Sequence, residues 1–138
     1  MDMNDLMSQV NETIAQQLAN KLMTLGELID FLELQPQDYE VRFDFTDQGP
    51  GPLNSYRGYY DHLAFTGTRH PPMVSEVLAD AKHALDNTFE GYKGGTYLMT
   101  RDTPLWYASD LGECHNTGIV KLTDEGGNIV MHTSYVAI

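Results

Sequence analysis

Apolar residues recur at steps of three and four in three parts of the chain, a spacing that places them on one face of a helix. The first run covers residues 3–22, the second follows Thr24, and the third covers residues 74–87. Thr24 and Glu27 have the spacing of a capping box, which marks the start of the second helix. Because proline pushes the preceding residue out of helical geometry, Pro36 marks its end. We therefore predict three helices.

Alternating apolar and polar residues predict strands in most of the remaining chain. The expected strands are residues 39–45, 62–68, 96–99 and 104–108, followed by a hairpin over residues 118–136. Residues 46–55, with the sequence TDQGPGPLNS, alternate glycine with proline and predict a loop. This order favours an α+β fold, with N-terminal helices, a small antiparallel sheet, a central helix and a C-terminal β-hairpin.

A chain of 138 residues fits one domain with one core. We expect residues 1–138 to form a single domain, with residues 1–23 as an N-terminal helical extension and residues 24–138 as the α+β core. The helix expected over residues 3–22 leaves an apolar stripe, which either packs on the domain or meets another subunit. We expect a symmetric homo-oligomer formed partly through this helix or its neighbour.

The charge balance limits the kinds of partner. The chain has 8 Lys and Arg against 20 Asp and Glu, for a net charge of −12. Such a surface repels polymeric nucleic acid, whereas a few local cations suffice for a small phosphate ligand. The acidity alone also fits a solvated surface, or a mimic of nucleic acid that occupies a basic partner.

The sequence also bears on location. No segment approaches 18 consecutive apolar residues, so we expect no contact with a membrane. Acidic residues lie near the start of the sequence, where a signal peptide would have basic residues. The lone Cys114 cannot form an internal disulfide, so the fold needs no oxidising compartment. We expect a cytoplasmic protein.

The sequence SYRGYY, residues 55–60, sets a cation among rings. Arg57 lies between Tyr56 and the pair Tyr59 and Tyr60. Aromatic faces stack on a planar ligand, and a guanidinium grips a phosphate through its fork of donors. The alternative is a tyrosine-rich turn whose rings cover a small core.

The sequence TFEGYKGG, residues 88–95, offers a similar combination. Its rings are Phe89 and Tyr92, its cation is Lys93, and its three glycines allow a ligand close to the backbone. The glycine spacing is not that of a P-loop. The alternative is a helix end followed by a tight turn.

Arg101 and Trp106 follow in the same neighbourhood. If the two loops converge, they form a pocket for a nucleotide-like molecule. Trp106 either lines this pocket or fills the core. The candidate ligand-binding residues are Tyr56, Arg57, Tyr60, Phe89, Tyr92, Lys93, Arg101 and Trp106.

Signals of catalysis are weak. Cys114 and His115 are adjacent, so their side chains point apart on a strand. The five histidines lack the HxxxH or HxH spacing of a zinc site. No carboxylate pair stands out as an acid and base. We expect no enzyme activity, no metal and no cofactor.

The order of these segments, TLGELIDFLE, VRFDF, SYRGYY, TFEGYKGG and TPLW, resembles a family of small bacteriophage proteins near the Thoeris anti-defense proteins. The resemblance covers residues 24–122, and the helix before Thr24 looks like an extension. It implies a small α/β oligomer that encloses a cyclic ADP-ribose isomer without cleaving it, and in some members a cyclic oligonucleotide at a separate site. It also implies a base-stacking role for Phe89, whereas Arg57 is inferred from its chemistry.

The expected function is therefore that of a sponge for a cyclic nucleotide immune signal. Two other classes remain open. The chain could inhibit a host defence protein directly, using its acidic surface for steering. It could also be an enzyme that degrades the signal.

Overall fold

The computed structural model describes residues 22–57, 59–91, 93–108 and 116–136. The helix predicted over residues 3–22 therefore lies outside the described part of the chain, apart from Leu22.

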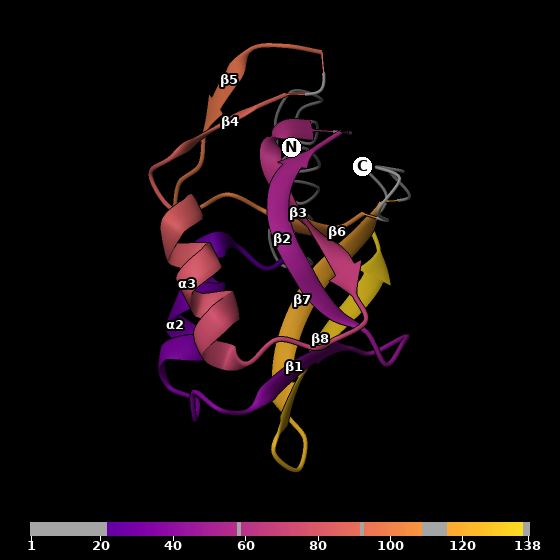
Figure 1. Ribbon diagram of the computed structural model, residues 1–138. Helices are drawn as coiled ribbons and strands as arrows, with labels where there is room; N and C mark the ends of the chain where they lie inside the picture. Colours follow the sequence, from indigo (N-terminus) through magenta and orange to yellow (C-terminus); the bar gives the residue numbers. More distant parts are fainter. Residues whose placement is uncertain (1–21, 58, 92, 109–115, 137–138) are drawn as a thin grey trace, which may run out of the picture.

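The described residues form two helices and eight strands (Figure 1). Their bounds are α2 Leu25–Glu33, β1 Glu40–Phe43, β2 Gly49–Tyr56, β3 Tyr59–Thr68, α3 Val74–Ala84, β4 Thr88–Glu90, β5 Thr96–Leu98, β6 Leu105–Tyr107, β7 Thr117–Asp124 and β8 Asn128–Tyr135. The α+β class, the second and third predicted helices and the C-terminal hairpin are confirmed.

The prediction of a small antiparallel sheet is wrong. Six strands form one mixed sheet in the order β1-β8-β7-β6-β3-β2, and β4 pairs with β5 in a separate hairpin. Two pairs in the large sheet, β1 with β8 and β3 with β6, are parallel. The parallel partners are far apart in sequence, and alternation along one strand does not indicate which other strand it will join.

The six-stranded sheet curls until its two end strands approach each other (Figure 1). The backbone N–H of Phe43, at the end of β1, donates to the carbonyl of Gln48 just before β2, at 3.0 Å. Next to it, the N–H of Val41 donates to the carbonyl of Pro72 at 2.8 Å. The sheet is thus a nearly closed barrel.

Residues 49–55 belong to strand β2, which corrects the prediction of a loop over residues 46–55. The ladder between β2 and β3 shifts register between Pro50 and Leu53, where the prolines have no N–H to donate. Close packing explains the glycine at position 51, since a Cβ there would lie 2.4 Å from Oγ1 of Thr66. Tertiary contacts therefore override the loop preference of the sequence.

Each helix begins at a hydrogen bond between a side chain of its first turn and the backbone just before it. Oγ1 of Thr24 accepts the N–H of Glu27 at 3.3 Å, and Oε1 of Glu27 accepts the N–H of Thr24 at 3.2 Å, so the predicted capping box is present. At the start of α3, Oε2 of Glu76 accepts the N–H of Met73 at 2.9 Å. The two helices pack beside each other on one side of the barrel (Figure 1).

Apolar residues from both helices and the inner faces of the strands form the main core. A second buried cluster covers the other face of β3 and β6, where Ala64 pairs with Trp106 in the parallel ladder. Its remaining members are Leu22, Tyr56, Ala108 and Val136. The middle of β3, residues 63–65, and the first two residues of β6 are therefore buried on both faces of the sheet.

Candidate ligand site at the end of the barrel

An unusual turn joins β2 to β3. Tyr56 pairs with Tyr59, so Arg57 lies at the tip of the turn. The next pair along the ladder is Ser55 with Leu63, so residues 60–62 have no ladder partner on β2, although the hydroxyl of Ser55 donates to the carbonyl of Tyr60 at 2.6 Å. A bulge of this kind redirects side chains at the end of a strand.

The β4–β5 hairpin carries the second glycine-rich segment. Phe89 pairs with Tyr97 across its two strands. Gly94 and Gly95, in the turn, have φ values of +97° and +84°, which L side chains rarely adopt. The segment is thus a β-hairpin whose tip depends on glycine.

These two segments touch. The rings of Tyr60 and Tyr97 have centroids 5.8 Å apart. A Cβ added to Gly91 would lie 2.8 Å from the Tyr97 ring and 3.1 Å from the Tyr60 ring, so only glycine allows this approach. The bulge in β3 and the β4–β5 hairpin therefore form one surface, called here the two-loop site.

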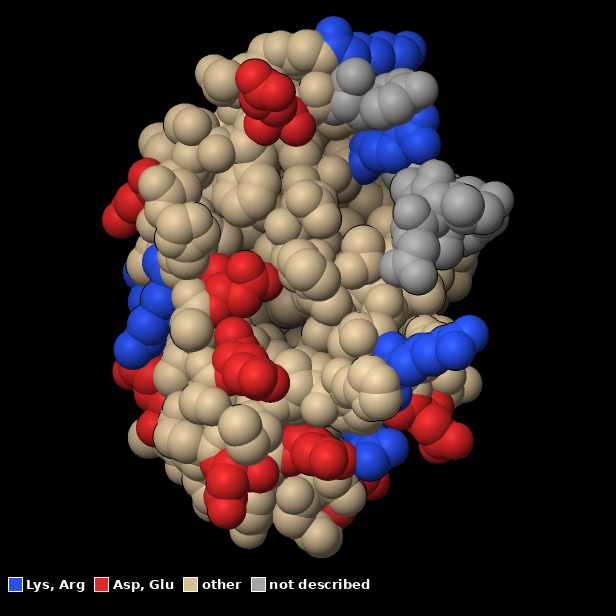
Figure 2. Space-filling model, in the orientation of Figure 1, with Lys and Arg blue, Asp and Glu red and all other residues tan. Residues whose placement is uncertain are grey.

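Both signs of charge occur at the two-loop site. Arg57 and Lys93 are exposed at the tips of its two turns. Figure 2 shows basic side chains gathered at the end of the molecule that carries these turns. The exposed carboxylates of Asp61 and Glu90 lie on the adjoining strands. Tyr92, the other predicted ring of this segment, lies outside the described residues.

Two further predicted residues have structural contacts. Phe89 is partly buried and packs against the main core. Arg101 forms an ion pair with Asp30 of α2 at 2.6 Å and donates to the carbonyl of Gly26. The guanidinium of Arg101 is therefore engaged by residues of α2.

Tyr56 and Trp106 lie inside the second cluster. Both side chains are 0% exposed, and their rings stack at 4.8 Å with an interplanar angle of 7°. The hydroxyl of Tyr56 also accepts the backbone N–H of Asn116 at 3.2 Å. Neither ring presents a face to a ligand in this structure, so their place in a binding surface is not supported by the geometry.

His62 extends this stack and has a fixed tautomer. The centroid of its ring lies 5.2 Å from the ring centroid of Tyr59. The indole N–H of Trp106 donates to Nδ1 of His62 at 2.9 Å. An indole nitrogen is only a donor, so Nδ1 must be unprotonated. Burial lowers the pKa of His62 from its ordinary value of 6.5, and the nearby Asp61 carboxylate offsets part of this shift.

This lowered pKa predicts a pH dependence of stability. As the pH falls below about 6.5, the unfolded chain takes up a proton at His62 before the folded chain does. The free energy of unfolding is therefore highest above 6.5 and decreases as the pH falls toward the lower folded-state pKa. We expect His62→Asn to reduce this decrease, because its amide oxygen can still accept the indole N–H without titrating.

The measurement is urea unfolding at a series of pH values for the wild type, His62→Asn and the exposed-residue control His70→Asn. The control should retain the wild-type dependence. Identical profiles for all three proteins would show that protonation of His62 does not contribute to the pH dependence of stability.

Two residues of this region, Tyr97 and His62, were not among the residues predicted from the sequence. Tyr97 was assigned to a strand without a role, although it lies in the same glycine-rich stretch as Lys93. His62 was considered only for metal spacing. Alternation within a strand shows which residues share a face, but the ring contacts of Tyr97 and His62 depend on the bulge in β3, which has no local signature.

The described ranges contain no group of three His, Cys, Asp or Glu side chains placed to hold a metal ion. None of the helices in these ranges is long and apolar enough to cross a membrane. Cys114 and His115 lie outside them.

Comparison of the chain with protein-family models, curated proteins and solved structures finds no match.

Proposed function

We propose that this protein sequesters a small cyclic nucleotide signal at the two-loop site without cleaving it. The observation that carries the proposal is the contact of Tyr60 with Tyr97 and Gly91, which joins two segments that each carry an exposed cation. The family resemblance in the sequence suggests the class of ligand, a cyclic ADP-ribose isomer or a cyclic oligonucleotide.

The chemistry of the site suits such a ligand. Partly exposed tyrosine rings can stack on a base, and the guanidinium of Arg57 can hold a phosphate with two parallel hydrogen bonds. Lys93 adds a point charge. A Cβ on Gly94 would have no atom within 4 Å, so a ligand can approach the backbone there.

A second candidate function is direct inhibition of a basic defence protein. The acidic side chains that Figure 2 shows across the rest of this face, away from the two-loop site, favour it, because they would steer a basic partner toward that surface. If the protein inhibits a partner protein directly, variants of the two-loop site should still bind that partner. If it sequesters a nucleotide, the same variants should lose binding.

Removal of Arg57 should weaken nucleotide binding. We expect Arg57→Ala to reduce affinity at least about tenfold, because a charge-assisted phosphate contact is lost. Arg57→Lys should restore little, since an ammonium lacks the planar fork. Calorimetric titration with the nucleotide that stabilises the wild type measures both effects.

Two matched variants sharpen this experiment. Arg101→Ala removes the same type of side chain from a residue paired with Asp30, so affinity should stay within about twofold of the wild type. Glu90→Gln removes a negative charge from the two-loop site and should strengthen binding. Equal affinities in Arg57→Ala and the wild type would rule out a ligand role for Arg57.

A further inference from the structure

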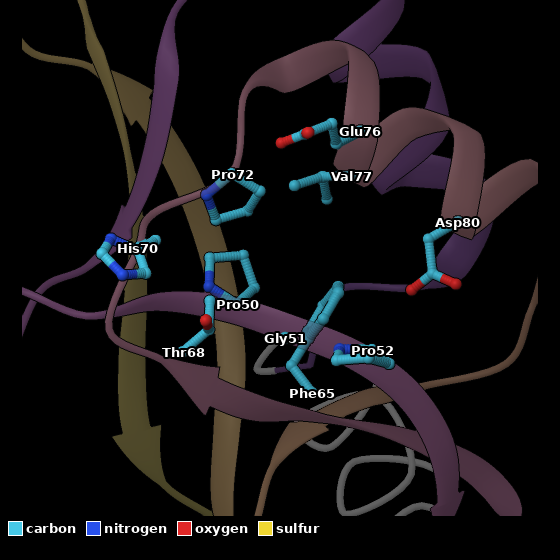
Figure 3. Close-up of a pocket in the computed structure, with 10 residues that line it drawn as sticks. All are labelled: Pro50, Gly51, Pro52, Phe65, Thr68, His70, Pro72, Glu76, Val77 and Asp80. Atoms are coloured by element: carbon cyan, nitrogen blue, oxygen red, sulfur yellow. The ribbon is translucent and has the colours of Figure 1, made fainter.

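A hollow of about 340 Å³ lies between α3 and the first half of β2, away from the two-loop site (Figure 3). Pro50 and Pro52 of β2 and Phe65 of β3 form its apolar lower wall, and Val77 of α3 forms part of the upper wall. This hollow, called here the proline groove, lies where the ladder between β2 and β3 shifts register, between Pro50 and Leu53.

Two carboxylates border the proline groove. Glu76 and Asp80 are four residues apart on α3, so their Cα atoms are separated by about 6 Å along the helix axis. Figure 3 shows both carboxylates directed toward the groove, with Val77 between them. Figure 2 shows acidic side chains along the border of a hollow in the middle of this face.

Each carboxylate is held in place through one oxygen. Oε2 of Glu76 accepts the N–H of Met73 at 2.9 Å, and Oδ2 of Asp80 accepts the N–H of Leu53 at 3.0 Å. Within the described part of the chain, Oε1 of Glu76 and Oδ1 of Asp80 accept no hydrogen bond and neither carboxylate forms an ion pair. Two anionic groups, each held through one oxygen, therefore border a hollow whose walls are mainly apolar and also include Thr68 and His70.

We propose that the proline groove binds a linear aliphatic diamine. One ammonium group meets Glu76 and the other meets Asp80, and the methylene chain between them lies over Val77 and the proline rings. A spacer of about four carbons suits the distance of one helical turn. The charge-assisted hydrogen bonds go to the oxygens that the fold leaves available.

Other ligand classes fit this groove less well. An anion would be repelled by both carboxylates. A divalent metal ion requires a fuller set of converging ligands than this groove offers: Thr68 and His70 also line it, but the described ranges contain no group of three His, Cys, Asp or Glu side chains placed to hold a metal ion. A monoamine would pair with one carboxylate and leave the other without a partner, so it should bind more weakly than a diamine.

The test is calorimetric titration of the full chain with 1,4-diaminobutane at low ionic strength, with butylamine as the comparison probe. We expect saturable binding of the diamine with a Kd of about 1 mM or tighter, and butylamine binding at least about tenfold more weakly. Glu76→Gln and Asp80→Asn should each weaken the diamine at least about tenfold. Both amides keep an oxygen that can accept the native backbone hydrogen bond, so the fold should survive.

Asp38→Asn is the control, because it makes the same change in charge at an exposed residue outside the groove. It should leave the diamine affinity within about twofold. An equal loss in all three variants would mean that the acidic surface attracts amines diffusely, and equal binding of butylamine would mean that the paired carboxylates do not select the ligand. Either result, or the absence of saturable binding, overturns the proposal without bearing on the two-loop site.

Discussion

Trp106→Ala should lower the free energy of unfolding by about 3–5 kcal/mol, the usual cost of truncating a large buried ring. Trp106 is 0% exposed and stacks on Tyr56 in the second cluster. Truncation removes this contact, opens a cavity between the outer face of β6 and its covering residues, and leaves Nδ1 of His62 without its donor. Since small domains are stable by about 5–15 kcal/mol, this is a large fraction of the total.

Urea unfolding monitored by circular dichroism measures this loss. Tyr135→Ala is the matched control, because Tyr135 is an aromatic residue with 68% of its surface exposed. Its substitution should change the free energy of unfolding by less than about 0.5 kcal/mol. If Trp106→Ala were as mild as this control, the ring would not be a core element, and the ligand-stacking role predicted from the sequence would gain support.

The second large effect is stabilisation by ligand. A nucleotide that binds only the folded state raises the free energy of unfolding by about 4 kcal/mol when its concentration is a thousandfold above Kd. In a panel of cyclic ADP-ribose isomers and cyclic di- and trinucleotides, we therefore expect one compound to produce a large rise in melting temperature.

The same compound should have a much smaller effect on Arg57→Ala at equal concentration, because that variant binds it more weakly. Arg101→Ala should respond as the wild type does. If no compound in the panel shifts the transition, direct inhibition of a defence protein becomes the better account of the function.

The parts of the fold that were predictable have local causes. The capping box of Thr24 and Glu27 marks the start of α2 in the sequence and in the structure. The C-terminal hairpin turns at two adjacent glycines, Gly126 and Gly127, both with positive φ. In each case, residues close in sequence supply the signal.

The parts that failed depend on distant residues. Strand β2 contains Pro50 and Pro52, which favour a loop locally, yet it pairs with β3 at the end of the sheet. The parallel pairing of β1 with β8 joins residues such as Val41 and Ile129, and periodicity within either segment does not indicate it. The mixed sheet could therefore not be derived from one sequence.

For the candidate site, too, local patterns in the sequence indicate some features, whereas others depend on contacts between distant residues. Arg57 and Lys93 were predicted as ligand-binding residues because a cation beside rings and glycines is visible in a short stretch, and both are exposed in the structure. Tyr56 and Trp106 have the same local character, and only the packing of the second cluster distinguishes them as buried. Arg101 was grouped with Arg57 by composition, whereas the ion pair with Asp30 depends on the position of α2.

The most direct test of nucleotide sequestration is a mass spectrum of the small molecules that heat releases from the purified protein. The protein should be produced in cells that carry a nucleotide-signalling defence and compared with Arg57→Ala produced in the same way. Sequestration predicts one intact cyclic nucleotide from the wild type and at least about tenfold less from the variant. Fragments of a nucleotide, or no nucleotide from either protein, would contradict it.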